Sequence, residues 1–139
     1  MDFVKMHGLG NDFVVVAGPF EPSADLVEAW CDRRRGIGGD GVLVVTSFGD
    51  GVRMEYWNAD GSPAEMCGNG LRCVARYAVD HGLVDAHAFP VQTAVGVRPV
   101  EVREDGMVRA LLGTVSTADA GPLDVAGYHL EPIRVGNPH

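Results

Sequence analysis

One helix-forming segment surrounded by strand-forming ones constrains this chain more than any other feature. After Cys-Gly-Asn-Gly at residues 67–70, apolar residues recur at i, i+3, i+4 and i+7, namely Leu71, Val74, Ala75 and Ala78. This spacing predicts a helix over about 68–80 with one apolar face. Most of the remaining chain has the pattern of short strands separated by turns. We therefore predict an α+β fold in which strands bury the apolar face of this helix.

The strand-like stretches lie at residues 4–7, 12–16, 42–46, 52–57, 89–93, 95–103, 107–112 and 128–135. Ser23 is placed to cap another helix, which we expect over about 24–34 with Gly36 as its stop. The basic run Arg33-Arg34-Arg35 would then lie in the last helical turn. There it would interact with the helix dipole and with water rather than bind an anion.

Charge and hydropathy exclude several classes of protein. The 139 residues include 19 acidic and 11 basic ones, for a net charge of −8, which argues against nucleic-acid binding. The longest apolar runs are too short to cross a bilayer, and no basic segment followed by an apolar stretch opens the chain. We therefore expect a cytoplasmic protein with neither a nucleic acid nor a membrane as partner.

The three cysteines are expected to differ in role. An odd number cannot pair fully within one chain, and no Cys or His spacing indicates a zinc or other metal site. Cys31 and Cys73 fall within predicted helices among apolar residues, which is typical of structural cysteines.

The glycine-rich segment at residues 36–41 does not have the pattern of a nucleotide-binding loop, because it lacks the Lys-Ser/Thr ending and leads into a strand.

Cys67 is the candidate for chemistry. It lies at the predicted start of a helix, where unsatisfied N–H groups and the positive end of the dipole favour a thiolate. The adjacent Gly68 and Asn69 would leave their backbone N–H groups uncovered, and such donors hold a carboxylate. Asn11, Asn58 and Asn137 follow turns or strands, and by residue type alone a role in stabilising a turn is favoured for each.

Four segments in order resemble the diaminopimelate epimerases. They are residues 6–13 (MHGLGNDF), 31–41 (CDRRRGIGGDG), 58–73 (from NADGS to CGNGLRC) and 135–139 (VGNPH). The resemblance implies a strongly curved, mostly antiparallel sheet that wraps a central helix, as one of two similar lobes. It also implies an isomerase, PLP-independent and homodimeric, that uses no cofactor.

In that family two cysteines flank the substrate, one removing the α-proton and the other returning a proton on the opposite face. By this resemblance Cys67 is one catalytic cysteine. The substrate-binding residues that it implies are Asn11, Asn58, Gly68, Asn69 and Asn137. His139 matches a histidine that tunes the thiols. The implied reaction converts LL- to meso-diaminopimelate, for lysine and peptidoglycan precursors.

The second cysteine block of the family, which resembles Cys-Gly-Thr-Gly, has no match in this sequence. We therefore expect residues 1–120 to form the N-terminal lobe and 121–139 to cross into a second lobe absent from this chain. The stop at His139, inside a motif, favours a truncated chain over half of a split enzyme, and the chain alone should be inactive. The alternatives are a racemase of another amino acid on the same scaffold and a non-catalytic subunit.

Overall fold

The computed structural model describes residues 2–114, 116–117, 121–131, 133–135 and 137–138. An eight-stranded sheet dominates it, in the order β1-β2-β3-β4-β6-β7-β8 with β5 paired to β4. The bounds are β1 (Phe3–Gly8), β2 (Asn11–Ala17), β3 (Gly41–Phe48), β4 (Gly51–Asn58), β5 (Pro63–Ala64), β6 (Ala88–Thr93), β7 (Gly96–Val102) and β8 (Val108–Ala110).

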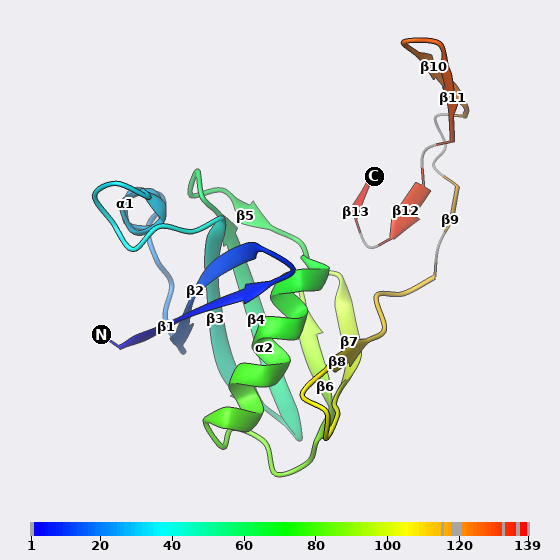
Figure 1. Ribbon diagram of the computed structural model, residues 1–139. Helices are drawn as coiled ribbons and strands as arrows, with labels where there is room; N and C mark the ends of the chain where they lie inside the picture. Colours follow the sequence, from blue (N-terminus) through cyan, green and yellow to red (C-terminus); the bar gives the residue numbers. More distant parts are fainter. Residues whose placement is uncertain (1, 115, 118–120, 132, 136, 139) are drawn as a thin grey trace.

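The sheet curls around helix α2 (Gly68–Asp80), which lies along its inner face (Figure 1). Most neighbouring strands are antiparallel, but β2 pairs with β3 and β4 pairs with β6 in parallel. Each parallel pair is joined through a helix, because parallel neighbours need a crossover connection. Helix α1 (Ala24–Cys31) joins the first pair and α2 joins the second. The predicted α+β fold, with a curved and mostly antiparallel sheet around a central helix, is confirmed.

The apolar face of α2 packs against the inner face of the sheet. Its bounds agree with the predicted helix, and the four residues of its predicted face are all fully buried. They contact Phe13 and Val15 of β2 and Leu43 of β3 in one cluster. Since a fully buried Val or Leu side chain contributes about 1.5–3 kcal/mol, this packing holds the start of α2 firmly against the sheet.

The outer face of β2 and β3 is buried as well. Alternate residues of a strand point to opposite faces, so Val14 and Val16 face away from α2. They pack with Val42 and Val44 against Val27 and Cys31 of α1. Burial on both faces explains why residues 13–16 and 42–45 are continuously apolar instead of alternating.

Helix α1 begins where predicted but ends three residues earlier. Ser23 caps it by accepting a hydrogen bond from the backbone N–H of Leu26. After Cys31, the carboxylate of Asp32 accepts the backbone N–H groups of Arg34 and Arg35 and turns the chain out of the helix. The expectation that the basic run occupies the last helical turn is therefore wrong.

The last described part of the chain forms two small sheets. Strands β10 (Leu123–Val125) and β11 (Tyr128–Leu130) make a hairpin, and β12 (Ile133–Val135) pairs with β9 (Ser116–Thr117) and β13 (Asn137–Pro138). The single strand predicted over 128–135 is thus wrong: its two halves pair with different partners.

No helix in the described ranges is long and apolar enough to span a membrane.

Candidate functional site

Three strands and the start of α2 meet at one end of the main sheet. Phe13 of β2, Gly41 of β3 and Asn58 of β4 lie side by side in the strand register. Asn11 therefore lies at the same end of the sheet as Asn58. The first residue before α2, Cys67, reaches this end from the inner face. Residues that are far apart in sequence are brought together here by strand pairing.

Cys67 is the N-cap residue of α2. Its backbone is extended, with φ −134° and ψ 123°, and its Sγ accepts a hydrogen bond from the backbone N–H of Gly70 at 3.5 Å. The side chain is half-buried, whereas Cys31 and Cys73 are buried. The predicted position of Cys67 at the helix start is confirmed, and its sulfur takes the place that Ser or Asp oxygen takes in ordinary N-caps.

The side chain of Asn11 connects Cys67 to an acidic residue that the sequence reasoning missed. The Cys67 thiol donates to Asn11 Oδ1 across 3.5 Å, and Asn11 Nδ2 donates to Asp40 Oδ2 at 2.7 Å. Asp40 lies in the 31–41 segment that carried the resemblance, but nothing in its spacing indicated contact with Asn11. Two turns 29 residues apart had to be placed together first.

Two basic residues neutralise the carboxylates beside this link. Arg33 donates to both Asp12 carboxylate oxygens, at 2.6 and 3.1 Å, and to Asp40 Oδ1 at 2.7 Å. Lys5 pairs with Asp12 at 2.9 Å. The Arg33 guanidinium and the Lys5 ammonium hold the pKa of Asp12 well below its usual range. Arg33 therefore binds anionic groups of the protein itself and is not merely solvated, which corrects the expectation for the basic run.

Gly68 and Asn69 form the first turn of α2. No acceptor within the described ranges takes the N–H of either residue, as is usual for the first positions of a helix. Arg72 folds back and donates to the Gly68 carbonyl at 3.1 Å and to Asn69 Oδ1 at 3.3 Å. A Cβ at Gly8 would meet the Asn69 carbonyl at 3.0 Å, so glycine there permits the β1–β2 turn to approach.

Asn58 lies at the same end of the sheet but is bound within its own loop. Its Nδ2 donates to Ser62 Oγ at 3.1 Å, and its backbone N–H donates to the Ser62 carbonyl at 2.9 Å. Asn58 therefore stabilises the turn over residues 58–62. Asn137 lies in β13, and the structure describes only its backbone. His139 lies outside the described residues.

Burial raises the pKa values of the two other cysteines and of Tyr56. It raises the pKa of Cys73 to about 11 and also raises that of Cys31. Burial, with the charge of Cys67 as a smaller contribution, raises the pKa of Tyr56 to about 12. These groups stay neutral near pH 7, so Cys67 remains the candidate for thiol chemistry among the three cysteines.

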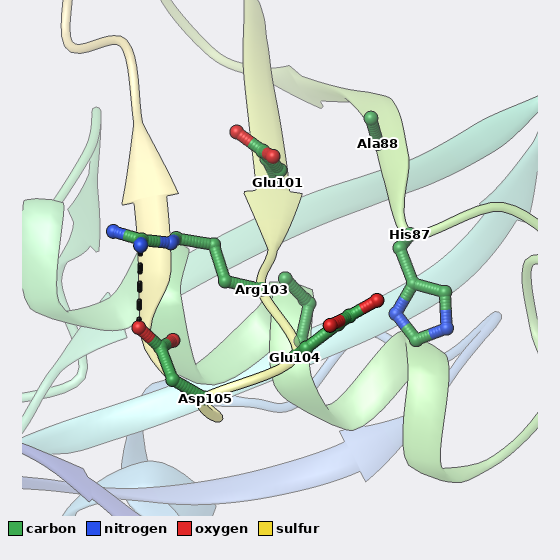
Figure 2. Close-up of a pocket in the computed structure, with 7 residues that line it drawn as sticks. His87, Ala88, Glu101, Arg103, Glu104 and Asp105 are labelled. Carbon is green, nitrogen blue, oxygen red and sulfur yellow. Dashed lines mark ion pairs between the residues drawn. The ribbon is translucent and has the colours of Figure 1, made fainter.

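A separate hollow of about 770 Å³ lies away from this site (Figure 2). Its polar lining comes from the residue before β6, from the end of β7 and from the β7–β8 turn, namely His87, Glu101, Arg103, Glu104 and Asp105. Arg103 pairs with Asp105 across 3.3 Å. No three His, Cys, Asp or Glu side chains in the described ranges gather as metal ligands would.

Comparison with known proteins identifies the family. The sequence model described as "Diaminopimelate epimerase" matches residues 3–118. The chain belongs to the diaminopimelate epimerase family. Diaminopimelate epimerases of Thermobifida fusca and Carboxydothermus hydrogenoformans are 42% and 41% identical to it over 159 and 160 aligned positions. Each alignment covers all of this chain and 58% of the relative, so the chain spans somewhat over half the length of these relatives.

Solved structures share the fold. A hydroxyproline epimerase from Agrobacterium vitis matches 94% of this chain with a TM-score of 0.68 and 11% identity, over 48% of its own chain. A probable proline racemase from Agrobacterium radiobacter matches with a TM-score of 0.66 and 13% identity, over the same shares. At such identities the likeness concerns the fold alone. The chain therefore shares its fold with these two proteins.

Proposed function

We propose that the whole protein epimerises diaminopimelate at its α-carbon without a cofactor, from the LL to the meso isomer, in the synthesis of lysine and peptidoglycan precursors. The observation that carries this proposal is the position of Cys67. Its half-buried sulfur caps α2 beside two backbone N–H groups that no acceptor in the described part of the chain takes. The relatives named diaminopimelate epimerase supply the substrate class.

In the proposed reaction the Cys67 thiolate removes the α-proton. The Cα–H bond breaks, the proton moves to Sγ, and the electron pair stays on the α-carbon, delocalised into the α-carboxylate. The N–H groups of Gly68 and Asn69 would bind that carboxylate and stabilise the added charge. A second acid on the opposite face returns a proton and inverts the centre. Cys31 and Cys73 are both buried, so neither is placed to act as this acid, and we propose that it belongs to a second lobe.

The remaining substrate contacts are proposed from the family pattern. Asn11 lies against Cys67 and is placed to contact a substrate held there. Asn58, at the same end of the sheet, and Asn137 would bind the distal amino-carboxylate end, and His139 would tune the thiols. The cytoplasmic location and the homodimer expected from the resemblance stay predictions.

We also propose that residues 1–120 form one lobe and that 121–139 lead into a second lobe. The relatives, which are longer than this chain, support this division. So does the hairpin of β10 and β11, in which Leu123 pairs with Leu130 and Val125 with Tyr128. These four apolar side chains share one face of the hairpin and are all exposed. A second lobe would cover them, as isolated hairpins with an apolar face are poorly stable.

Exchange of the substrate α-proton with solvent tests the proposal directly. The complete gene product in D₂O should incorporate deuterium into LL-diaminopimelate, and Cys67→Ala should reduce this rate by about 10³-fold or more, because the only base on one face is lost. Cys73→Ala is the matched control and should keep activity. If Cys67→Ala still epimerises the substrate, Cys67 is not the base.

Two alternatives predict other results. A racemase of the same scaffold would exchange the α-proton of another amino acid faster than that of diaminopimelate, and a panel of substrates detects this. The shared fold with proline-type enzymes makes proline and hydroxyproline the first to include. A non-catalytic subunit would leave exchange unaffected by Cys67→Ala while the protein still binds its partner lobe.

A further inference from the structure

The two ends of the Asn11 amide face different partners. Its carbonyl oxygen accepts from the Cys67 thiol, and its NH₂ group donates to the Asp40 carboxylate. A carboxylate only accepts hydrogen bonds, so Asp40 can face the NH₂ end of the amide but not the oxygen end. The acceptor atom Oδ2 of Asp40, which also takes the backbone N–H of Asp12, therefore selects which end of Asn11 is turned toward the sulfur.

This choice matters for the sulfur. An amide oxygen beside Cys67 accepts from the protonated thiol and opposes the thiolate, whereas an NH₂ group there would donate to the thiolate and favour it. On its other side the sulfur accepts the N–H of Gly70, which favours the thiolate. The two hydrogen bonds have opposite effects on ionisation of the thiol: the Gly70 N–H favours the thiolate, and the Asn11 oxygen favours the protonated thiol.

We propose that Asp40 is a positioning residue for Cys67: by fixing the orientation of the Asn11 amide, it keeps the reactive sulfur able to hold a proton as well as to release one. The inference rests on the proposed function, because an epimerase cysteine must take a proton in one direction of the reaction and give one in the other. Asp40 acts only through Asn11 and has no contact with Cys67 among the described interactions.

The carboxylate of Asp40 is itself well held. Oδ2 accepts from Asn11 and from the backbone N–H of Asp12 at 3.0 Å, while Oδ1 accepts from Arg33 at 2.7 Å. The backbone N–H of Asp40 donates to the Asp12 carbonyl at 2.7 Å. These bonds join the loop before β3 to the start of β2. Asp40 is thus fixed before it orients Asn11.

Other titratable groups around the sulfur have different partners or stay neutral. Tyr56 remains protonated, because burial raises its pKa to about 12. Arg72 bonds to the Gly68 carbonyl and to Asn69 Oδ1. Cys73 is buried, and its pKa of about 11 keeps it protonated. The Asn11 amide is therefore the neighbouring group whose orientation can change the balance at Cys67.

Alkylation of Cys67 by iodoacetamide tests the proposal in the complete gene product. Trypsin cleaves after Arg53 and Arg72, so the peptide 54–72 contains Cys67 and no other cysteine. Its modified fraction can be followed by mass spectrometry at one fixed pH near 7. Asp40→Ala frees the amide to rotate and should raise the alkylation rate about 3- to 10-fold. Asp40→Asn keeps an acceptor for the Asn11 NH₂ and should stay within about twofold of the unchanged protein.

Asp105→Ala is the matched control, since Asp105 forms an exposed ion pair with Arg103 in another part of the sheet. It should leave the alkylation rate unchanged. Asn11→Ala removes the amide and keeps the ion pairs of Asp40, so it should raise the rate like Asp40→Ala even if that variant folds poorly. Adding Asp40→Ala to Asn11→Ala should have no further effect, because the group through which Asp40 acts is gone.

The proposal is overturned if Asn11→Ala leaves the alkylation rate unchanged, or if Asp40→Asn alters it as much as Asp40→Ala. The second result would assign the role to the charge pair with Arg33. Alkylation needs no substrate, so these outcomes are independent of the proposed function. If the epimerase proposal fails, the protein will not exchange the α-proton of diaminopimelate, yet the coupling of Asp40 to Cys67 will still be measurable.

Discussion

The start and the middle of α2 carry the same residue type in opposite surroundings. Cys67 caps the helix, is half-buried and has polar partners in Gly70 and Asn11. Cys73, six residues later, is 2% exposed and belongs to the apolar cluster between helix and sheet. One helix thus contains a half-buried thiol with polar partners and a buried thiol that packs within the core.

The difference arises from the helix itself. Only the first turn has N–H groups without helical acceptors, and only there does the dipole favour an anion. In the middle of α2 the backbone groups bond to each other, and a buried sulfur meets apolar side chains alone. Position on the helix, rather than residue type, therefore distinguishes the two cysteines.

Alkylation kinetics offer the strongest way to break this comparison. At pH 8 a thiol with a pKa of about 11 is ionised about 0.1% of the time, and Cys73 is also shielded from solvent. We expect iodoacetamide to modify Cys67 on the order of 100-fold faster than Cys73. The tryptic peptides 54–72 and 73–76 report the two sites separately. Equal rates in the folded protein would remove the distinction.

Replacing each cysteine by serine should sharpen the comparison of Cys67 with Cys73, because the two changes should affect the free energy of unfolding differently. Cys73→Ser buries a hydroxyl among apolar groups, and we expect a loss of about 1–3 kcal/mol in the free energy of unfolding. Cys67→Ser should leave stability unchanged or slightly raised, because serine is a preferred N-cap residue. Urea titrations of both variants measure this. A larger loss from Cys67→Ser than from Cys73→Ser would contradict the packing role.

The smallest expected effect is the loss of folding stability at acidic pH. The lowered pKa of Asp12, caused first by Arg33 and then by Lys5, means that its ion pairs stabilise the fold above the unfolded pKa of about 3.9. That stabilisation is lost as the pH falls from there toward the folded pKa. We expect Asp12→Asn to lower stability by about 1 kcal/mol at pH 6 and by progressively less below pH 4.

Thermal unfolding of the unchanged protein and Asp12→Asn across this pH range provides the measurement. Asp80→Asn breaks an exposed ion pair with Arg76 at the far end of α2 and serves as the control. A constant difference between Asp12→Asn and the unchanged protein at all pH values would show that these ion pairs do not stabilise the fold.

Local patterns were enough to predict α2. The helix over 68–80, its buried face and the capping position of Cys67 all follow from apolar spacing and from glycines within one segment. The strands of the main sheet other than β5, whose two residues were expected in a loop, were predicted to within a few residues for the same reason. Helix α1 was predicted too long, because the Asp32 turn competes with the helix through side-chain hydrogen bonds that apolar spacing does not register.

The contacts around Cys67 could not be predicted in this way. Asn11 and Asp40 are 29 residues apart, and Asn11 and Cys67 are 56 apart. They meet because β2 and β3 pair in parallel through α1, and α2 then lies along the inner face of the curled sheet. Hydrogen bonds between distant turns leave no periodic trace in a sequence. Residue order thus specifies the helix and its cap, while sheet pairing specifies which side chains face the sulfur.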